Sequence, residues 1–92
     1  MSSPPIKAAS GVVEKFLRSN GYGGITLPPR GIFILAERMG EAGLIAHETV
    51  HWDQYQRMGL FKFYSTYFRE TLKHGYKDNA MEVEARDKSG AV

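Results

Sequence analysis

The apolar positions of this chain change their spacing several times, and each change marks a predicted element. Residues 10–19 carry apolar side chains at helical spacing, and Ser10 is a candidate cap for the helix that they predict. The glycine-rich run 20–24 ends that helix. Residues 1–8 show no clear period, so we expect them to form a loose N-terminal leader ahead of a single domain that spans residues 9–90.

Two strands and three helices are predicted in the rest of the chain. The short runs 25–27 and 32–35 are rich in β-branched and apolar residues and flank a turn that contains proline and glycine, which predicts a β-hairpin. Helical spacing then returns and is divided into three helices: about 41–58, about 60–74, and a short one that Asp78 or Asn79 caps and that ends near residue 88. This order predicts a small α+β domain.

Composition excludes several classes of protein. The 92 residues include 42% hydrophobic residues and no cysteine, which indicates one globular domain with neither disulfides nor a cysteine-ligated metal. The formal net charge is only +2 and the basic residues are scattered, so we expect no nucleic-acid partner and no membrane partner. No apolar run could span a bilayer, and the first ten residues lack the apolar core of a secretory signal peptide, so we expect a cytoplasmic location.

The motif that carries chemistry is an HExxH sequence over residues 47–51, within the predicted helix 41–58. Because residues four apart lie one above the other on a helix, His47 and His51 can bind one metal ion together. Zinc is the usual ion for two histidines and a carboxylate, and Glu48 would lie beside it as the general base for a zinc-bound water. All three residues fall in the apolar arc of the helical wheel, where a metal would offset the cost of burying them.

A third ligand must come from outside this helix, and the residues leave three candidates open: His74, Glu82 and Glu84. The two glutamates flank the expected buried side of the last helix almost symmetrically. Glu82 also has a competing structural role, because Asn79 three residues before it completes the signature of a capping box. His74 would serve as a C-terminal cap of its own helix. Spacing alone does not choose among the three.

An HExxH motif followed by a glutamate on a later helix resembles the gluzincin arrangement of thermolysin-like peptidases. The segment that begins at Glu82 is similar to the Glu-x-Glu-Ala segment of the ImmA/IrrE-like peptidases. The chain also resembles small phage and bacterial proteins in which HExxHxxQ is followed by Asn-x-x-Glu-x-Glu-Ala, with Gln54 and Asn79 in the flanking places. The resemblance covers about residues 32–87 and implies that Glu82 is the third zinc ligand.

One position departs from the gluzincin pattern. Arg86 stands four residues after the implied ligand, where related peptidases commonly have an Asp or Asn that orients a ligand histidine. A guanidinium cannot accept a proton from an imidazole N–H. Asp87 or a backbone carbonyl would have to orient the histidine instead.

The resemblance implies a minimal zinc metallopeptidase that acts on a peptide or protein substrate in the cytoplasm or in a phage-associated setting. Tyr76, just before the last helix, is the expected stabiliser of the oxyanion, with Tyr64 and Tyr67 as alternatives. In zincins a strand beside the metal helix pairs with extended substrate, and residues 32–35 resemble that strand. The usual second lobe is missing, so we expect a shallow cleft that a partner protein or a larger assembly would complete.

Two other interpretations compete with this one. The zinc could stabilise a non-catalytic protein-binding module, although a purely structural site has no need of a base at Glu48. The chain could instead be a regulatory domain that docks through the aromatic helix 60–74. Strong burial of Phe61, Tyr64 and Phe68 would count against that docking face.

Overall fold

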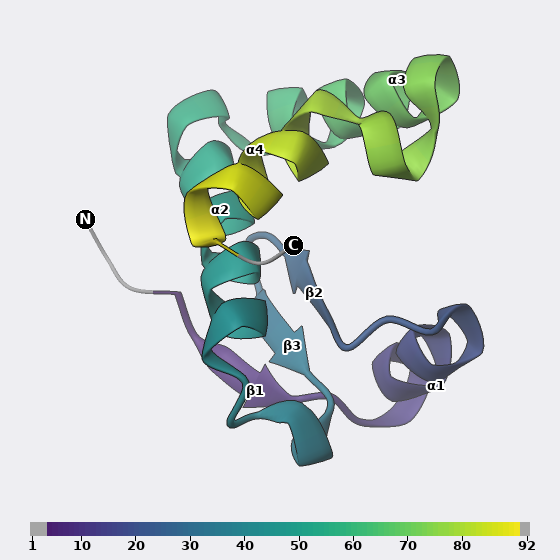
Figure 1. Ribbon diagram of the computed structural model, residues 1–92, viewed down its shortest axis with the longest axis vertical. Helices are drawn as coiled ribbons and strands as arrows, with labels where there is room; N and C mark the ends of the chain where they lie inside the picture. The colour runs from purple at the N-terminus through teal and green to yellow at the C-terminus, as the bar shows by residue number, and fades with distance from the viewer. Residues whose placement is uncertain (1–3, 91–92) are drawn as a thin grey trace.

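The computed structural model describes residues 4–90, and its elements follow the predicted order with two short additions (Figure 1). The elements are β1 (Ile6–Ala8), α1 (Gly11–Asn20), β2 (Gly24–Leu27), β3 (Gly31–Ile34), the 3₁₀ turn η1 (Ala36–Arg38), α2 (Ala42–Met58), α3 (Leu60–Asp78) and α4 (Ala80–Ser89). Strand β1 and turn η1 are the additions. The α+β class predicted from the sequence is therefore confirmed for the described residues.

The sheet has the strand order β1-β3-β2, so β3 is its central strand. Strands β2 and β3 form the predicted antiparallel hairpin, and β1 pairs with β3 in parallel. The prediction of a loose leader is wrong for residues 6–8. All three residues of β1 are exposed, so this strand lacks the alternation of buried and exposed residues by which a half-buried strand is predicted. Backbone pairing holds it instead: the amide of Ile32 donates to the carbonyl of Pro5, and the amide of Ala9 donates to the carbonyl of Ile34. Residues 1–3 of the expected leader lie outside the described residues.

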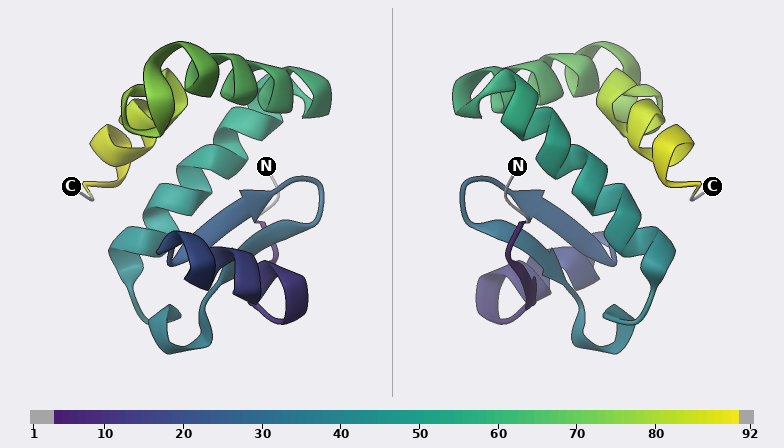
Figure 2. Two further views of the ribbon diagram at one scale, coloured as in Figure 1. Left: turned by 90° about the vertical axis from the view of Figure 1, so that its right-hand side faces the viewer. Right: turned by 90° about the vertical axis from the view of Figure 1, so that its left-hand side faces the viewer.

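The two faces of the sheet are covered by different helices, as Figures 1 and 2 show. Ile32 and Ile34 are fully buried on one face, where they pack against Trp52 of α2. Successive side chains of a strand point to opposite faces, and Phe33 accordingly packs in the other cluster, around Leu17 of α1. Helix α2 therefore lies on the sheet, and its orientation on the sheet sets the direction of the HExxH motif.

Helices α3 and α4 fold back against α2 and against each other (Figure 2). Gly75 has φ 78° and ψ 170°, which interrupts α3 at the residue where the sequence predicts its end. The fully buried Asn79 joins the two helices. Its Oδ1 accepts from the amide of Met81 and so caps α4, while its Nδ2 donates to the carbonyl of Tyr67 and the hydroxyl of Thr71. This joint fixes where the side chains of α4 meet α2.

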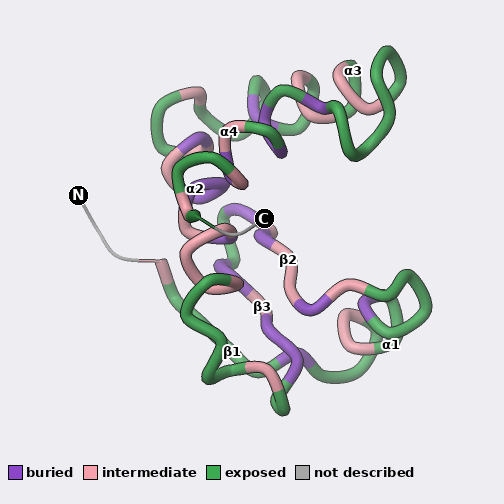
Figure 3. Tube along the Cα trace, in the orientation of Figure 1, coloured by how far each residue is buried: buried purple, intermediate pink, exposed green. Residues whose placement is uncertain are grey.

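Burial is concentrated on the sheet and on α2, whereas most of α3 is exposed (Figure 3). Phe63 is the one buried residue of α3. Within residues 4–90, no helix is both long enough and apolar enough to cross a membrane.

Candidate functional site

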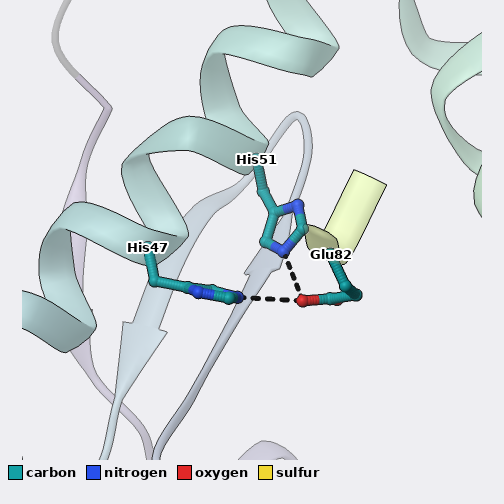
Figure 4. A group of neighbouring side chains, drawn as sticks. All are labelled: His47, His51 and Glu82. Carbon is teal, nitrogen blue, oxygen red and sulfur yellow. Dashed lines mark hydrogen bonds and ion pairs between the residues drawn. The ribbon is translucent and has the colours of Figure 1, made fainter. Parts of the chain in front are cut away.

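Helix α2 presents the HExxH motif toward α4. His51 and Glu48 are buried, and His47 is half-buried. Both imidazole rings point to one place, where the carboxylate of Glu82 enters from α4 (Figure 4). The burial of two histidines and two carboxylates in one region demands specific partners, because an unpaired buried charge is strongly unfavourable.

Three ligand atoms converge at this point. Oε1 of Glu82 lies 2.9 Å from Nε2 of His47 and 3.1 Å from Nε2 of His51. The potential ligand atoms of the three residues all lie within 4.8 Å of one another. A tetrahedral zinc ion with ligands about 2.0–2.1 Å away separates those ligands by about 3.3 Å. The two distances to Oε1 of Glu82 would have to widen by only a few tenths of an ångström to accept the ion, and two imidazoles with a carboxylate are a donor set that fits zinc.

The other two candidates for the third ligand lie elsewhere. His74 is exposed on α3. The carboxylate of Glu84 faces away from the histidines and pairs with Arg57 and Lys88. Hydrogen bonds from Lys88 and Gln54 lower the pKa of Glu84 to about 2. The capping-box role considered for Glu82 is also absent, because its carboxylate meets the two imidazoles and Tyr67.

Gln54 fixes the orientation and tautomer of His51. It is almost completely buried, and its Nε2 donates to the carbonyl of Met81 and to Glu84. The atom that faces His51 is therefore Oε1, which lies 2.8 Å from Nδ1 of the imidazole. An amide oxygen can only accept, so Nδ1 carries a proton, and Nε2 is the nitrogen that would bind a metal once it gives up its own proton. Gln54 thus takes the orienting role expected of Asp87 or a backbone carbonyl. Arg86 instead donates to the carbonyl of Lys77.

Electrostatic coupling within the cluster is strong. Burial opposes charge on Glu82, but hydrogen bonds from His47 and His51 outweigh it and lower the pKa of this carboxyl. Burial likewise opposes charge on His51, but the hydrogen bond and charge of Glu82 prevail and raise the pKa of the imidazole. The hydroxyl of Tyr67 donates a further hydrogen bond to Oε2 of Glu82. Glu82 is therefore an anion held by three donors, which is the state that a metal ligand requires.

Glu48 lies beside this cluster but is not part of it. Its Oε1 lies 2.8 Å from Oγ1 of Thr26, which is also 2.9 Å from the backbone carbonyl of Glu48. Strand β2 contacts α2 here, because a Cβ added to Gly24 would lie 3.5 Å from Cγ of Glu48. Burial raises the pKa of Glu48, against the charge of His51 and the hydrogen bond of Thr26. This carboxylate has an increased affinity for a proton.

A cavity of about 290 Å³ opens between β2 and α3, and part of the site lines it. All four residues of β2 line one wall, and Phe63, Tyr64, Tyr67 and Thr71 of α3 line the other, while Glu48, His51 and Glu82 lie between them. A second cavity of about 430 Å³ adjoins it and is lined by His47, Arg38 and Glu41. Helix α3 thus forms the far wall that the absence of a second lobe had suggested would be missing.

Tyr22 and Tyr76 line both cavities and separate them. Their rings stack with centroids 5.5 Å apart and an interplanar angle of 20°. Burial and the charges of Glu82 and Glu48 raise the pKa of Tyr76, so its phenol stays neutral and able to donate. Of the three tyrosines considered for the oxyanion, Tyr67 donates to Glu82 and Tyr64 to the carbonyl of Pro28. Within residues 4–90, the hydroxyl of Tyr76 has no hydrogen-bond partner.

Strands β1 and β2 each leave one edge of the sheet open, so residues 32–35, which resemble the substrate-pairing strand of zincins, do not lie at an edge. Strand β3 is paired on both sides because β1, which the sequence did not reveal, occupies its second edge. The carbonyl of Gly23 accepts from the amide of Leu35. Because antiparallel pairing alternates, the backbone groups of Gly24 and Thr26 point away from β3, toward the open edge.

The contacts of three site residues were found only in the structure: Gln54, Tyr67 and Thr26. The partnership of Gln54 with His51 could have been found, because residues three apart share a helix face. Tyr67 was considered only for the oxyanion, and Thr26 was not considered at all. Neither has a sequence signal, because the contacts of both depend on how β2 and α3 pack around α2.

Comparison of the chain with protein-family models, with curated proteins and with solved structures gives no match in any of the three. The functional argument therefore depends on the geometry of the site itself.

Proposed function

We propose that this protein is a zinc-dependent metallopeptidase in which His47, His51 and Glu82 hold the ion and Glu48 is the general base. The observation that carries the proposal is that Oε1 of Glu82 lies 2.9 Å from Nε2 of His47 and 3.1 Å from Nε2 of His51, beside a cavity that His51 and Glu82 line. Two imidazoles and a carboxylate are the donor set of catalytic zinc sites that keep a fourth position open. When bound, zinc would polarise the scissile carbonyl and lower the pKa of a water molecule.

Glu48 is suited to moving the proton. Its carboxylate lines the same cavity as Glu82 and His51 and forms no ion pair among the described residues. Because burial raises its pKa, it can accept a proton from water and return it to the leaving amine. The hydroxyl of Thr26 holds one carboxylate oxygen and leaves the other free for that transfer.

Tyr76 is the proposed donor to the oxyanion. Its hydroxyl is the uncommitted one among the three candidate tyrosines, and stacking on Tyr22 restricts the position of its ring. Donors of this kind typically contribute about 10²–10³-fold to the rate.

The substrate would be an extended peptide that adds to the open edge of β2. The free backbone groups of Gly24 and Thr26 supply the pairing, and α3 supplies the opposite wall. Both walls belong to this chain, so a partner protein or larger assembly would extend this cleft rather than form it.

The competing function is a non-catalytic, zinc-stabilised binding module. Glu48 favours the enzyme, because a buried carboxylate beside the ion has a cost and gives a structural site no benefit. The cavity beside it is a second argument, because a structural zinc site is closed by its four protein ligands.

The test is Glu48→Gln, assayed with a library of unstructured peptides on zinc-loaded protein. The amide keeps the size of the side chain but cannot accept the proton, so we expect about 10²–10⁴-fold lower turnover with zinc content unchanged. Glu37→Gln, at an exposed position on η1 that lines neither cavity, is the matched control and should retain full turnover. Equal turnover by Glu48→Gln and the unmodified protein would sink the proposal, and no turnover by either with one zinc per chain would establish the binding module.

A further inference from the structure

Helix α3 carries a stripe of large apolar side chains that covers nothing in this chain. Phe61, Phe68 and Leu72 are 91%, 66% and 71% exposed. Their spacing of seven and four residues puts them on one side of the helix. Neither hydrophobic cluster of the core includes any of them. Exposed apolar residues in isolation are ordinary, but three aligned along one helix indicate a surface that binds something.

A basic stripe lies directly beside the apolar one. Lys62, Arg69 and Lys73 each follow a residue of the apolar stripe by one position, so they repeat its spacing on the adjacent side of the helix. None of the ion pairs among residues 4–90 includes any of the three. The only carboxylate in the helical part of α3, that of Glu70, instead accepts from the amide of Ala80. The positive charge of this face is thus uncompensated.

We propose that this outer face of α3, defined by Phe61, Phe68, Leu72 and the basic stripe, binds an amphipathic helix of a partner protein with acidic residues along one flank. Two parallel stripes of identical spacing fit a linear partner that runs along α3 with apolar side chains facing the first stripe and carboxylates facing the second. The small, exposed Ser65 lies one turn after Phe61, on the same side as the apolar stripe, and leaves a gap that a partner side chain can enter. The apolar stripe spans about 17 Å, the length of three helical turns.

The charge pattern argues against a second copy of this chain as the partner. In an antiparallel pair of α3 helices, each basic stripe would face the other and repel it. In a parallel pair, each basic stripe would face the opposite flank of the apolar stripe, where Leu60 and Tyr64 offer no acidic group. A partner with its own acidic flank satisfies both stripes.

The proposed interface does not involve the zinc ligands. The inner side of α3, with Phe63 and Tyr67, lines the cavity, whereas the binding face is on the outer side. Docking would support the outside of the cleft wall, and the interface exists whether or not the site is catalytic.

The test measures binding of the zinc-loaded full chain to two labelled peptides by fluorescence anisotropy. Each peptide has about 21 residues in three heptads with leucine at the a and d positions; one has glutamate at e and g, the other lysine. We expect the glutamate peptide to bind at least about tenfold more tightly, with the difference decreasing at high salt. Phe68→Ser should weaken that binding by about tenfold or more, and Arg69→Glu should shift the preference toward the lysine peptide.

Lys15→Glu on α1 is the matched control, because it changes the net charge by the same amount at an exposed site away from α3. It should leave the preference between the two peptides intact, and circular dichroism of each variant checks that the fold is retained. Equal affinity for both peptides, or no change with Arg69→Glu, would overturn the proposal. So would a dimer in sedimentation equilibrium that Phe68→Ser abolishes, or binding to vesicles of anionic phosphatidylglycerol that exceeds binding to the glutamate peptide.

Discussion

Helix α2 packs on two sides, and the two interfaces differ in kind. Toward the central strand of the sheet, Trp52 packs on Ile32 and Ile34, so that contact is apolar, and the polar contact of Glu48 with Thr26 lies beside it on β2. Toward α4, the same helix presents His51 and Gln54, and their contacts are hydrogen bonds to groups of α4. The first interface is stabilised by removing apolar area from water, which needs no particular geometry. The second is stable only while each buried polar group keeps its partner.

This contrast divides the domain into two parts that are stabilised in different ways. The first part is the sheet with α1 and α2, and the second is the α3–α4 segment. The sheet with α1 and α2 can hold its shape without an ion. The attachment of α4 depends more on the cluster around Glu82, although Met81 and Ala85 add some buried apolar area. We therefore expect the sheet to be the scaffold and the α3–α4 segment to be the part whose stability responds to zinc.

The largest expected loss of stability comes from a core substitution in the first part, the sheet with α1 and α2. Leu17 is fully buried beneath the sheet, so Leu17→Ala should lower the free energy of unfolding by about 2–5 kcal/mol. Val12→Ala on the same helix is the control, and it should change little because Val12 is 84% exposed. Chemical denaturation measures both. If Leu17→Ala also lowers zinc affinity while the protein is still folded, packing of the sheet part and zinc binding by the second part are not independent.

Removal of zinc should destabilise the second part, the α3–α4 segment. Free zinc at 100 times its dissociation constant contributes about 2.7 kcal/mol of stability. We expect chelation to speed amide exchange in α4 by up to about 100-fold and to leave the amides of Ile32 and Ile34 nearly unchanged. Hydrogen exchange read by mass spectrometry distinguishes the segments. Equal acceleration in α4 and in the sheet would mean that the domain opens as one unit.

A smaller effect is expected when the orientation of one ligand is loosened. Gln54→Ala removes the acceptor for Nδ1 of His51 and leaves all three ligands in place. Changes to such supporting groups typically cost 10–100-fold in metal affinity, and we expect a loss of about that size in a zinc competition titration. Gln56→Ala, an exposed position on the same helix, is the matched control. Unchanged affinity in Gln54→Ala would show that packing alone orients the imidazole.

The parts of the fold that the sequence predicted are those with a local signal. Glycines at 59 and 75 bracket the helical part of α3, and the hairpin follows from its turn residues. Strand β1 could not be predicted, because three exposed residues show no periodicity and their pairing partner lies 26 positions further along the chain. Without β1, the sequence could not show that β3 is paired on both sides and so cannot itself pair with an added strand.

The site, like the fold, was predicted only where the sequence carries a local signal. The spacing of His47 and His51 predicted their shared face, and the structure brings Glu82 to them. The residues alone could not choose between Glu82 and Glu84, because both flank the buried side of one helix. Packing makes that choice, through the rotation of α4 that Asn79 fixes at its start. The sequence also could not show which aromatic residues of α3 are exposed, because the apolar half of its helical wheel is divided between the cavity and solvent.

The central claim is that His47, His51 and Glu82 form one metal site, and the zinc content of purified variants measured by mass spectrometry tests it most directly. The account predicts one zinc per chain in the unmodified protein and in Glu84→Ala, and loss of zinc in both His47→Ala and Glu82→Ala. Zinc retained by Glu82→Ala and lost by Glu84→Ala would contradict the account.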